Sequence, residues 1–431
     1  MYDGLYTFAV RLLNIGMAAG LTVLTARMLG PGGRGIYALP GVEAALVASA
    51  FGGLSSATSY FLLNRNAARQ VLLPVFGCAA ILAAIAAGLL FVITGLTGQQ
   101  WAAPPAAAVL PSLALLNVAT GYAIGVKRVR FTTTLTALQT FLTIAAIGLS
   151  FVLFAKTPQI AIAAWIGATA LAAVVATAAV LIDSRTRLTG SDRVGFAEYV
   201  RFCARVSAVY VVSLLNYRVD LYIVALFLPA AALGMYGIAV SAAESLLVPT
   251  QVAALVTSPH IGGLDIRGAG LLTARCVRNN LLVALAVCVP LLVFAAPLIG
   301  AIYGTRFLPL VPAFDVLLVG VLALSLSSPV SSYFTLKLGR PQVAFWLASV
   351  SAVICIATTL MLIHRYGMVG AALGSTAGYI AGQALALVYF GRVSALGWRE
   401  MLVPTSGDFS LYFAFAGRLL RDGRRLLRPV H

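Results

Sequence analysis

The chain has 431 residues, of which 61% are hydrophobic and only 10% are charged. This composition excludes a water-soluble protein and predicts an integral membrane protein. The 29 lysines and arginines outnumber the 12 acidic residues, and the formal net charge of +17 is consistent with nucleic acid, anionic lipid or an anionic substrate as the partner. Because the basic residues lie between long apolar runs and not together on one soluble face, we expect no nucleic-acid partner.

Apolar segments long enough to cross the roughly 30 Å hydrocarbon core of a bilayer recur along the sequence. The first contains Arg11 and is too long for the apolar region of a cleaved signal peptide, so we interpret it as a membrane helix. We predict an all-α protein with about twelve transmembrane helices, at residues 5–29, 36–63, 71–97, 106–126, 132–154, 160–182, 200–228, 231–257, 279–303, 311–336, 342–363 and 368–391.

The basic residues are distributed unevenly among the loops. Loops after even-numbered helices hold 14 of the 29, and the segment after the last helix holds seven more. Loops after odd-numbered helices hold only five, which are Arg27, Arg34, Lys156, Arg306 and Arg365. Since cytoplasmic loops carry the excess of positive charge, we predict that the even loops and both termini face the cytoplasm.

Two segments about 200 residues apart share a pattern of proline, glycine, tyrosine and glutamate. They are Pro31, Gly35, Tyr37 and Glu43 in the first segment and Pro229, Gly234, Tyr236 and Glu244 in the second. Each pattern joins an odd-numbered helix to the next, which indicates a duplication of six helices. We therefore predict an N-terminal bundle at residues 1–190 and a C-terminal bundle at 191–391, related by a pseudo-twofold axis along the membrane normal.

Residues 392–431 form a basic tail after the last predicted helix. Arg418, Arg421, Arg425 and Arg428 recur at helical spacing, with leucines offset from them. This pattern predicts an amphipathic cytoplasmic helix on the anionic inner leaflet, and the alternative is a docking site for partners in glycan assembly.

The sequence predicts no cofactor and no metal site. Residues 30–35 match GxGxxG, but they join two membrane helices and follow no strand, so tight turns explain their glycines better than a dinucleotide does. The five cysteines, which we expect to be buried apolar residues, form no CxxC pair: Cys78, Cys203, Cys276, Cys288 and Cys355.

The segments from Ala26 to Pro31 and from Gly33 to Leu39 resemble the signature between the first two helices of bacterial polysaccharide-export flippases of the Wzx type. The segments from Asn216 to Asp220 and from Gly234 to Ala239 resemble that family's seventh helix and its turn into the eighth. The family belongs to the multidrug/oligosaccharidyl-lipid/polysaccharide exporter superfamily. The resemblance implies two six-helix bundles facing a central cavity in the bacterial inner membrane. It also implies flipping of an undecaprenyl-pyrophosphate-linked oligosaccharide to the outer leaflet by alternating access, for cell-surface polysaccharide biosynthesis.

Ionisable side chains inside membrane helices are costly, and by default they face a cavity or the bundle interior. Arginine suits a pyrophosphate because its planar guanidinium binds phosphate oxygens through two parallel bonds. Arg11 and Arg218 occupy equivalent helices of the two halves, so we predict that they bind the headgroup. Asn14, one turn from Arg11, and Asn216, beside Arg218, are candidate hydrogen-bonding partners of the sugar or phosphate.

A structural role for these arginines stays open. Arg11 with Glu43, or Arg218 with Glu244, could form plain interhelical ion pairs. Glu43, Asp220 and Glu244 could instead carry H⁺ or Na⁺ during transport, since a buried carboxylate can load and release a cation.

Two other classes of function compete with a flippase. A multidrug/cation antiporter of the same superfamily would favour carboxylates and aromatic residues over arginines in its cavity. A membrane polymerase or ligase of glycan assembly would need a large outer loop, whereas each predicted outer loop has about eight residues or fewer, so we expect no enzyme. A peptidoglycan-precursor flippase is a further relative, with extra helices for which this chain lacks room. Glycan polymerases or glycosyltransferases are possible partners, besides the lipid bilayer and the lipid-linked glycan.

Overall fold

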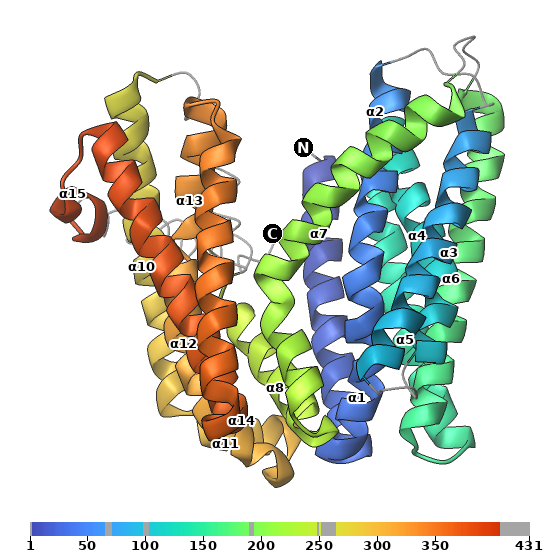
Figure 1. Ribbon diagram of the computed structural model, residues 1–431, viewed down its shortest axis with the longest axis horizontal. Coiled ribbons are helices and arrows are strands. Elements are labelled where there is room, and N and C mark those ends of the chain that lie inside the picture. The colour runs from blue at the N-terminus through green and yellow to red at the C-terminus, as the bar shows by residue number, and fades with distance from the viewer. Residues whose placement is uncertain are drawn as a thin grey trace, which may run out of the picture. The chain divides into compact units, whose positions relative to one another are not determined.

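The computed structural model describes residues 2–64, 71–97, 103–188, 194–247, 250 and 264–405 (Figure 1). Within these ranges each regular element is helical and no strand occurs. The all-α prediction is therefore confirmed. The chain forms two compact units, the first comprising Met1–Ile238 with Ile299–Leu310 and the second Ala239–Leu298 with Val311–His431. The predicted bundle boundary after residue 190 stays a prediction.

The first unit begins with α1 (Tyr2–Ala48), which contains a sharp reversal. At Gly30 the backbone has φ 68° and ψ 178°, a conformation that a residue with a side chain rarely adopts, so the helix breaks there and the chain turns back (Figure 1). The second arm continues through η1 (Ser49–Phe51) and α2 (Gly52–Asn64). This reversal separates the first two predicted membrane helices.

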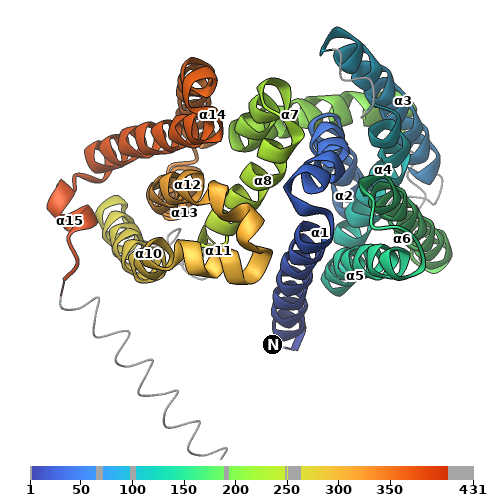
Figure 2. The same ribbon diagram turned by 90° about the horizontal axis from the view of Figure 1, so that it is seen from below.

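The remaining helices of the first unit pack around α4 (Ala103–Gly125), which contacts α2, α3 (Leu72–Thr97) and α6 (Pro158–Arg187) (Figure 2). Small residues make these contacts close, since a Cβ on Gly121 would overlap the backbone of Ser55. Two further helices, α5 (Val129–Leu153) and α7 (Phe196–Phe227), pack on α6 and α2 respectively. The unit ends in the first part of α8 (Ala230–Glu244) and includes the end of α11 (Ala295–Tyr303) and η3 (Thr305–Leu310).

The second unit is built on α10 (Ile266–Val293), α12 (Val311–Leu324) and α14 (Pro341–Ser394). Three short elements, α13 (Ser327–Ser332), the π-helical η4 (Tyr333–Lys337) and α15 (Trp398–Leu402), pack beside them. Gly367 has φ 57° and breaks α14 as Gly30 breaks α1. The Tyr333 and Phe390 rings meet edge to face at 5.0 Å in the core of this unit.

Eight helical segments in the described ranges are long and apolar enough to cross a bilayer. Two of them, Ala9–Leu63 and Gln342–Ser394, have 55 and 53 residues and contain the breaks at Gly30 and Gly367, so each has the length for two crossings. Each of the twelve predicted helices overlaps a described helix. The chain is a multi-pass membrane protein.

All five cysteines are buried, as expected from their apolar neighbours. The predicted amphipathic helix of the tail lies outside the described residues, which end at Thr405.

Candidate functional site

The first arm of α1 carries two of the predicted headgroup residues. Arg11 is exposed, and Asn14, three residues later on the same side of the helix, is half-buried. The Asn14 Oδ1 atom is buried and accepts no hydrogen bond from the described residues. A buried carbonyl oxygen without a donor is costly, so this amide is available to a ligand hydroxyl or N–H group.

Glu43 lies on the second arm of α1, beyond the break at Gly30. Its side chain is half-buried, and its buried Oε2 atom accepts no hydrogen bond in the described part of the chain. No ion pair joins Glu43 to Arg11 there. The structure therefore contains a carboxylate oxygen that lacks a protein donor, inside a membrane-spanning segment.

The second predicted cluster lies near the end of α7. Asp220 is only 2% exposed, and its Oδ2 atom accepts a hydrogen bond from the Tyr236 hydroxyl at 2.8 Å. Its Oδ1 atom accepts a second hydrogen bond, from the Leu221 backbone N–H at 2.8 Å. Arg218 is half-buried, and the side chain of Asn216 lies outside the described residues. The structure thus gives Asp220 a positioning role that ties α7 to α8.

Glu244, the last predicted member, is the final residue of α8 and belongs to the second unit. Its side chain is half-buried. Its pairing with Arg218 and its part in ion coupling stay predictions.

The two repeated motifs meet directly in the first unit. A Cβ on Gly35 would overlap the Ala230 carbonyl, and one on Gly234 would lie 2.5 Å from the Pro31 oxygen and 2.6 Å from the Gly35 nitrogen. The break in α1 and the start of α8 therefore cross in backbone contact, which only glycine at both positions permits. The two copies of the sequence repeat are therefore in direct contact in the structure.

We predict that Tyr236→Phe destabilises the protein by about 1–3 kcal/mol, because it removes a hydrogen bond to a carboxylate. Thermal unfolding of the purified protein in detergent measures the effect. Tyr37→Phe is the matched control, since Tyr37 holds the equivalent place in the first motif and its hydroxyl makes no hydrogen bond in the described residues. Equal melting temperatures for the two variants would contradict the positioning role of Tyr236.

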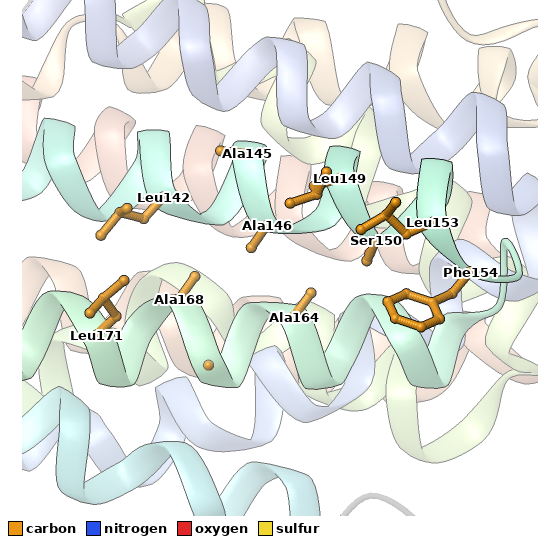
Figure 3. Close-up of a pocket in the computed structure, with 11 residues that line it drawn as sticks. Leu142, Ala145, Ala146, Leu149, Ser150, Leu153, Phe154, Ala164, Ala168 and Leu171 are labelled. Atoms are coloured by element: carbon orange, nitrogen blue, oxygen red, sulfur yellow. The ribbon is translucent and has the colours of Figure 1, made fainter.

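An apolar cavity of about 440 Å³ lies between α5 and α6 (Figure 3). Leu142, Ala146 and Leu149 of α5 line it opposite Ala164 and Leu171 of α6. The hydroxyl of Ser150, a polar residue in this lining, already donates to the Ile147 carbonyl at 2.8 Å. Such a lining suits a hydrocarbon chain and offers nothing to a sugar or a phosphate.

The described residues contain no group of three or more histidine, cysteine, aspartate or glutamate side chains placed to hold a metal ion. The predicted site residues offer amide, guanidinium and carboxylate groups, and their joint part in binding a headgroup stays a prediction.

Comparison with known families decides the classification of the chain. Residues 24–312, more than half of its length, match the family model described as polysaccharide biosynthesis protein. The chain belongs to this family. The resemblance read from the motifs around Gly30 and Asp220 is thereby confirmed at the level of the family. A search of curated proteins found no match.

Solved structures show the same fold at low sequence identity. A lipid II flippase, MurJ, in an inward closed conformation aligns with a TM-score of 0.70 at 15% identity, over 91% of this chain and 89% of that chain. An inward-facing multidrug resistance MATE family transporter of the MOP superfamily aligns with a TM-score of 0.69 at 17% identity. The alignment covers 90% of this chain and 98% of that chain. An outward-facing MATE family transporter aligns with a TM-score of 0.60 at 15% identity, over 91% of this chain and 95% of that chain. The chain has the fold of this transporter superfamily.

The sequence did not predict the hydrogen-bonding partner of Asp220, nor the backbone contact that Gly35 and Gly234 permit. Tyr236, Gly35 and Gly234 were visible only as letters of a repeated motif, with no indication of what they contact. The signal was the repeat itself, because it singled out both segments that the structure brings together.

Proposed function

We propose that this protein is a flippase that moves an undecaprenyl-pyrophosphate-linked oligosaccharide from the cytoplasmic to the outer leaflet by alternating access, for cell-surface polysaccharide biosynthesis. The observation that carries the proposal is the match of residues 24–312 to the polysaccharide biosynthesis family. The fold adds support, since it is shared with a protein named as a lipid II flippase and with transporters solved in inward-facing and outward-facing conformations. The protein is then a transporter and not an enzyme.

In this proposal Arg11 and Arg218 bind the pyrophosphate, with Asn14 and Asn216 as hydrogen-bonding partners. An Arg guanidinium stays charged at low dielectric, so it can replace part of the water that the headgroup loses. The isoprenoid chain stays in the bilayer, and apolar surfaces such as the cavity between α5 and α6 are suited to it. The proposed location of the protein is the bacterial plasma membrane, with both termini in the cytoplasm. Its proposed partners there are glycosyltransferases and a glycan polymerase.

The direct test uses purified protein in phosphatidylcholine vesicles with a lipid-linked oligosaccharide. Translocation is measured as the gain in cleavage of the glycan by a glycosidase on the far side. We expect translocation at least tenfold faster than in empty vesicles. An unchanged rate, together with efflux of an organic cation dye by the same vesicles, would establish the antiporter function instead.

Glu43 favours ion coupling, since its buried Oε2 atom has no protein donor in the described residues. We predict that an imposed H⁺ or Na⁺ gradient accelerates translocation by the wild type and that Glu43→Gln removes this acceleration, because an amide cannot exchange a cation. Glu198→Gln, in the first turn of α7, is the control and should respond to the gradient like the wild type. Retention of the full gradient response in Glu43→Gln would rule out this residue as the carrier.

A further inference from the structure

Three arginines predicted to face outside gather around the break in α1. Arg27 and Arg34 flank Gly30, and Arg306 comes from η3 in the same unit. One Arg306 guanidinium nitrogen, Nη1, lies 4.0 Å from the place that a Cβ on Gly30 would occupy. Arg306 therefore lies beside the break that Arg27 and Arg34 flank, although 279 positions separate Arg27 from Arg306.

Arg27 has a structural task in this cluster. Its Nε atom donates to the Ile302 carbonyl at 2.7 Å, and its Nη2 atom donates to the Ala301 carbonyl. These carbonyls lie in the last turn of α11, where backbone oxygens have no partner within the helix and a cation is favourable. Arg27 thus fixes the end of α11, and the segment with Arg306, against α1.

Arg34 has no such task. Its guanidinium carbon lies 5.1 Å from the centre of the Tyr37 ring, and its Nε atom is buried without a hydrogen-bond acceptor in the described residues. Among the described residues, the groups that interact electrostatically with Arg34 are two phenols, Tyr37 and Tyr303. A buried guanidinium N–H without an acceptor indicates a place for an anionic oxygen.

None of the three arginines forms an ion pair with an aspartate or glutamate within the described ranges. Arg27 and Arg306 are exposed, and Arg34 is half-buried. Positive charges that no described carboxylate neutralises favour the approach of a multivalent anion.

We propose that Arg34 and Arg306 form a second anion site, positioned by Arg27, which binds the diphosphate of the transported lipid at the outer end of the first unit. The assignment to the transported lipid rests on the proposed function, and the outer position rests on the loop charges. The site differs from the one predicted at Arg11 and Arg218, which lies within the membrane helices. It receives the headgroup as it emerges into the outer leaflet.

The test measures binding of inorganic pyrophosphate by the full-length protein in phosphatidylcholine nanodiscs, by calorimetry at constant ionic strength. Two pyrophosphate sites are expected in the wild type, the other being the one predicted at Arg11 and Arg218. We expect Arg34→Gln and Arg306→Gln each to weaken binding at the second site at least tenfold. Arg34→Lys, which keeps the charge and loses the planar fork, should give an intermediate value. The control is Arg365→Gln, because Arg365 is also predicted to lie outside and also stacks on a tyrosine, at 5.7 Å from Tyr366. Unchanged melting temperatures confirm that the variants are folded.

A second arm distinguishes the transported lipid from ordinary phospholipid. Nanodiscs containing phosphatidylglycerol should leave the apparent pyrophosphate affinity of the wild type unchanged. If phosphatidylglycerol weakens pyrophosphate binding to the wild type and not to Arg34→Gln, the site takes bulk lipid headgroups and the assignment to the transported lipid is overturned.

The remaining outcomes separate this proposal from the proposed function. Absence of pyrophosphate binding, or binding that depends on Arg218 and not on Arg34 or Arg306, overturns the second site even if the vesicles translocate the oligosaccharide. Binding that depends on Arg34 and Arg306, without translocation in vesicles, supports the anion site and removes the flippase assignment.

Discussion

Replacement of Arg11 or Arg218 by alanine is expected to abolish surface glycan while leaving the amount of protein in the membrane unchanged. Each guanidinium in this proposal makes charge-assisted hydrogen bonds to the pyrophosphate, and each such bond contributes about 1.5–3 kcal/mol. Loss of one such hydrogen bond therefore weakens headgroup binding by roughly ten- to a hundredfold. Folding should be spared at Arg11 because that side chain is exposed.

Arg205→Ala is the matched control. Arg205 lies on α7, the helix of Arg218, and its side chain is exposed. Because it is expected to reach the cytoplasmic interface and not the cavity, its loss should leave surface glycan within about twofold of the wild type. Surface glycan is measured by immunoblotting, and protein level by a tag on the same strains. Normal glycan in both Arg11→Ala and Arg218→Ala would remove these residues from the substrate site.

The membrane helices could be predicted from the sequence because their cause is local. An apolar run must be about 20 residues long to cross the bilayer, and polar breaks end it. The predicted limits 160–182 and 71–97 accordingly fall within a few residues of α6 and α3. The reversal in α1 was also visible, because a glycine at position 30 precedes a proline at position 31, and the two rarely continue a straight helix.

The contacts of the candidate site could not be predicted in the same way. The part of Asp220 in ion coupling or in an interhelical pair stays a prediction. Its phenol donor, Tyr236, could not be predicted, because that contact depends on how α8 folds back on α7. In the sequence, Arg34 and Arg306 are two of the five basic residues in the predicted outer loops. No local pattern indicates that segments about 270 residues apart meet. Counting the charges did mark both arginines as exceptions to the cytoplasmic excess of basic residues.

Gly35→Ala is expected to destabilise the protein strongly and to abolish export. The added methyl group would overlap the carbonyl of Ala230, which is backbone and cannot rotate away. The crossing of α1 and α8 must then separate, at a cost of about 3 kcal/mol or more, the upper end of the range for overpacked sites. Separation would also disturb the neighbouring Asp220–Tyr236 hydrogen bond, because Tyr236 lies only six residues after Ala230.

Gly32→Ala provides the control, three residues away, since a Cβ there meets nothing within 4 Å. Glycine to alanine in a helix ordinarily stabilises by about 0.5–1 kcal/mol, so this variant should be at least as stable as the wild type. Gly234→Ala, on the other side of the crossing, should reproduce the defect of Gly35→Ala, because its Cβ would lie 2.5 Å from the Pro31 oxygen. Melting temperature in detergent and surface glycan in cells are measured for all three variants. If Gly35→Ala and Gly32→Ala behave alike in both measurements, the two repeated motifs are not held together by backbone contact.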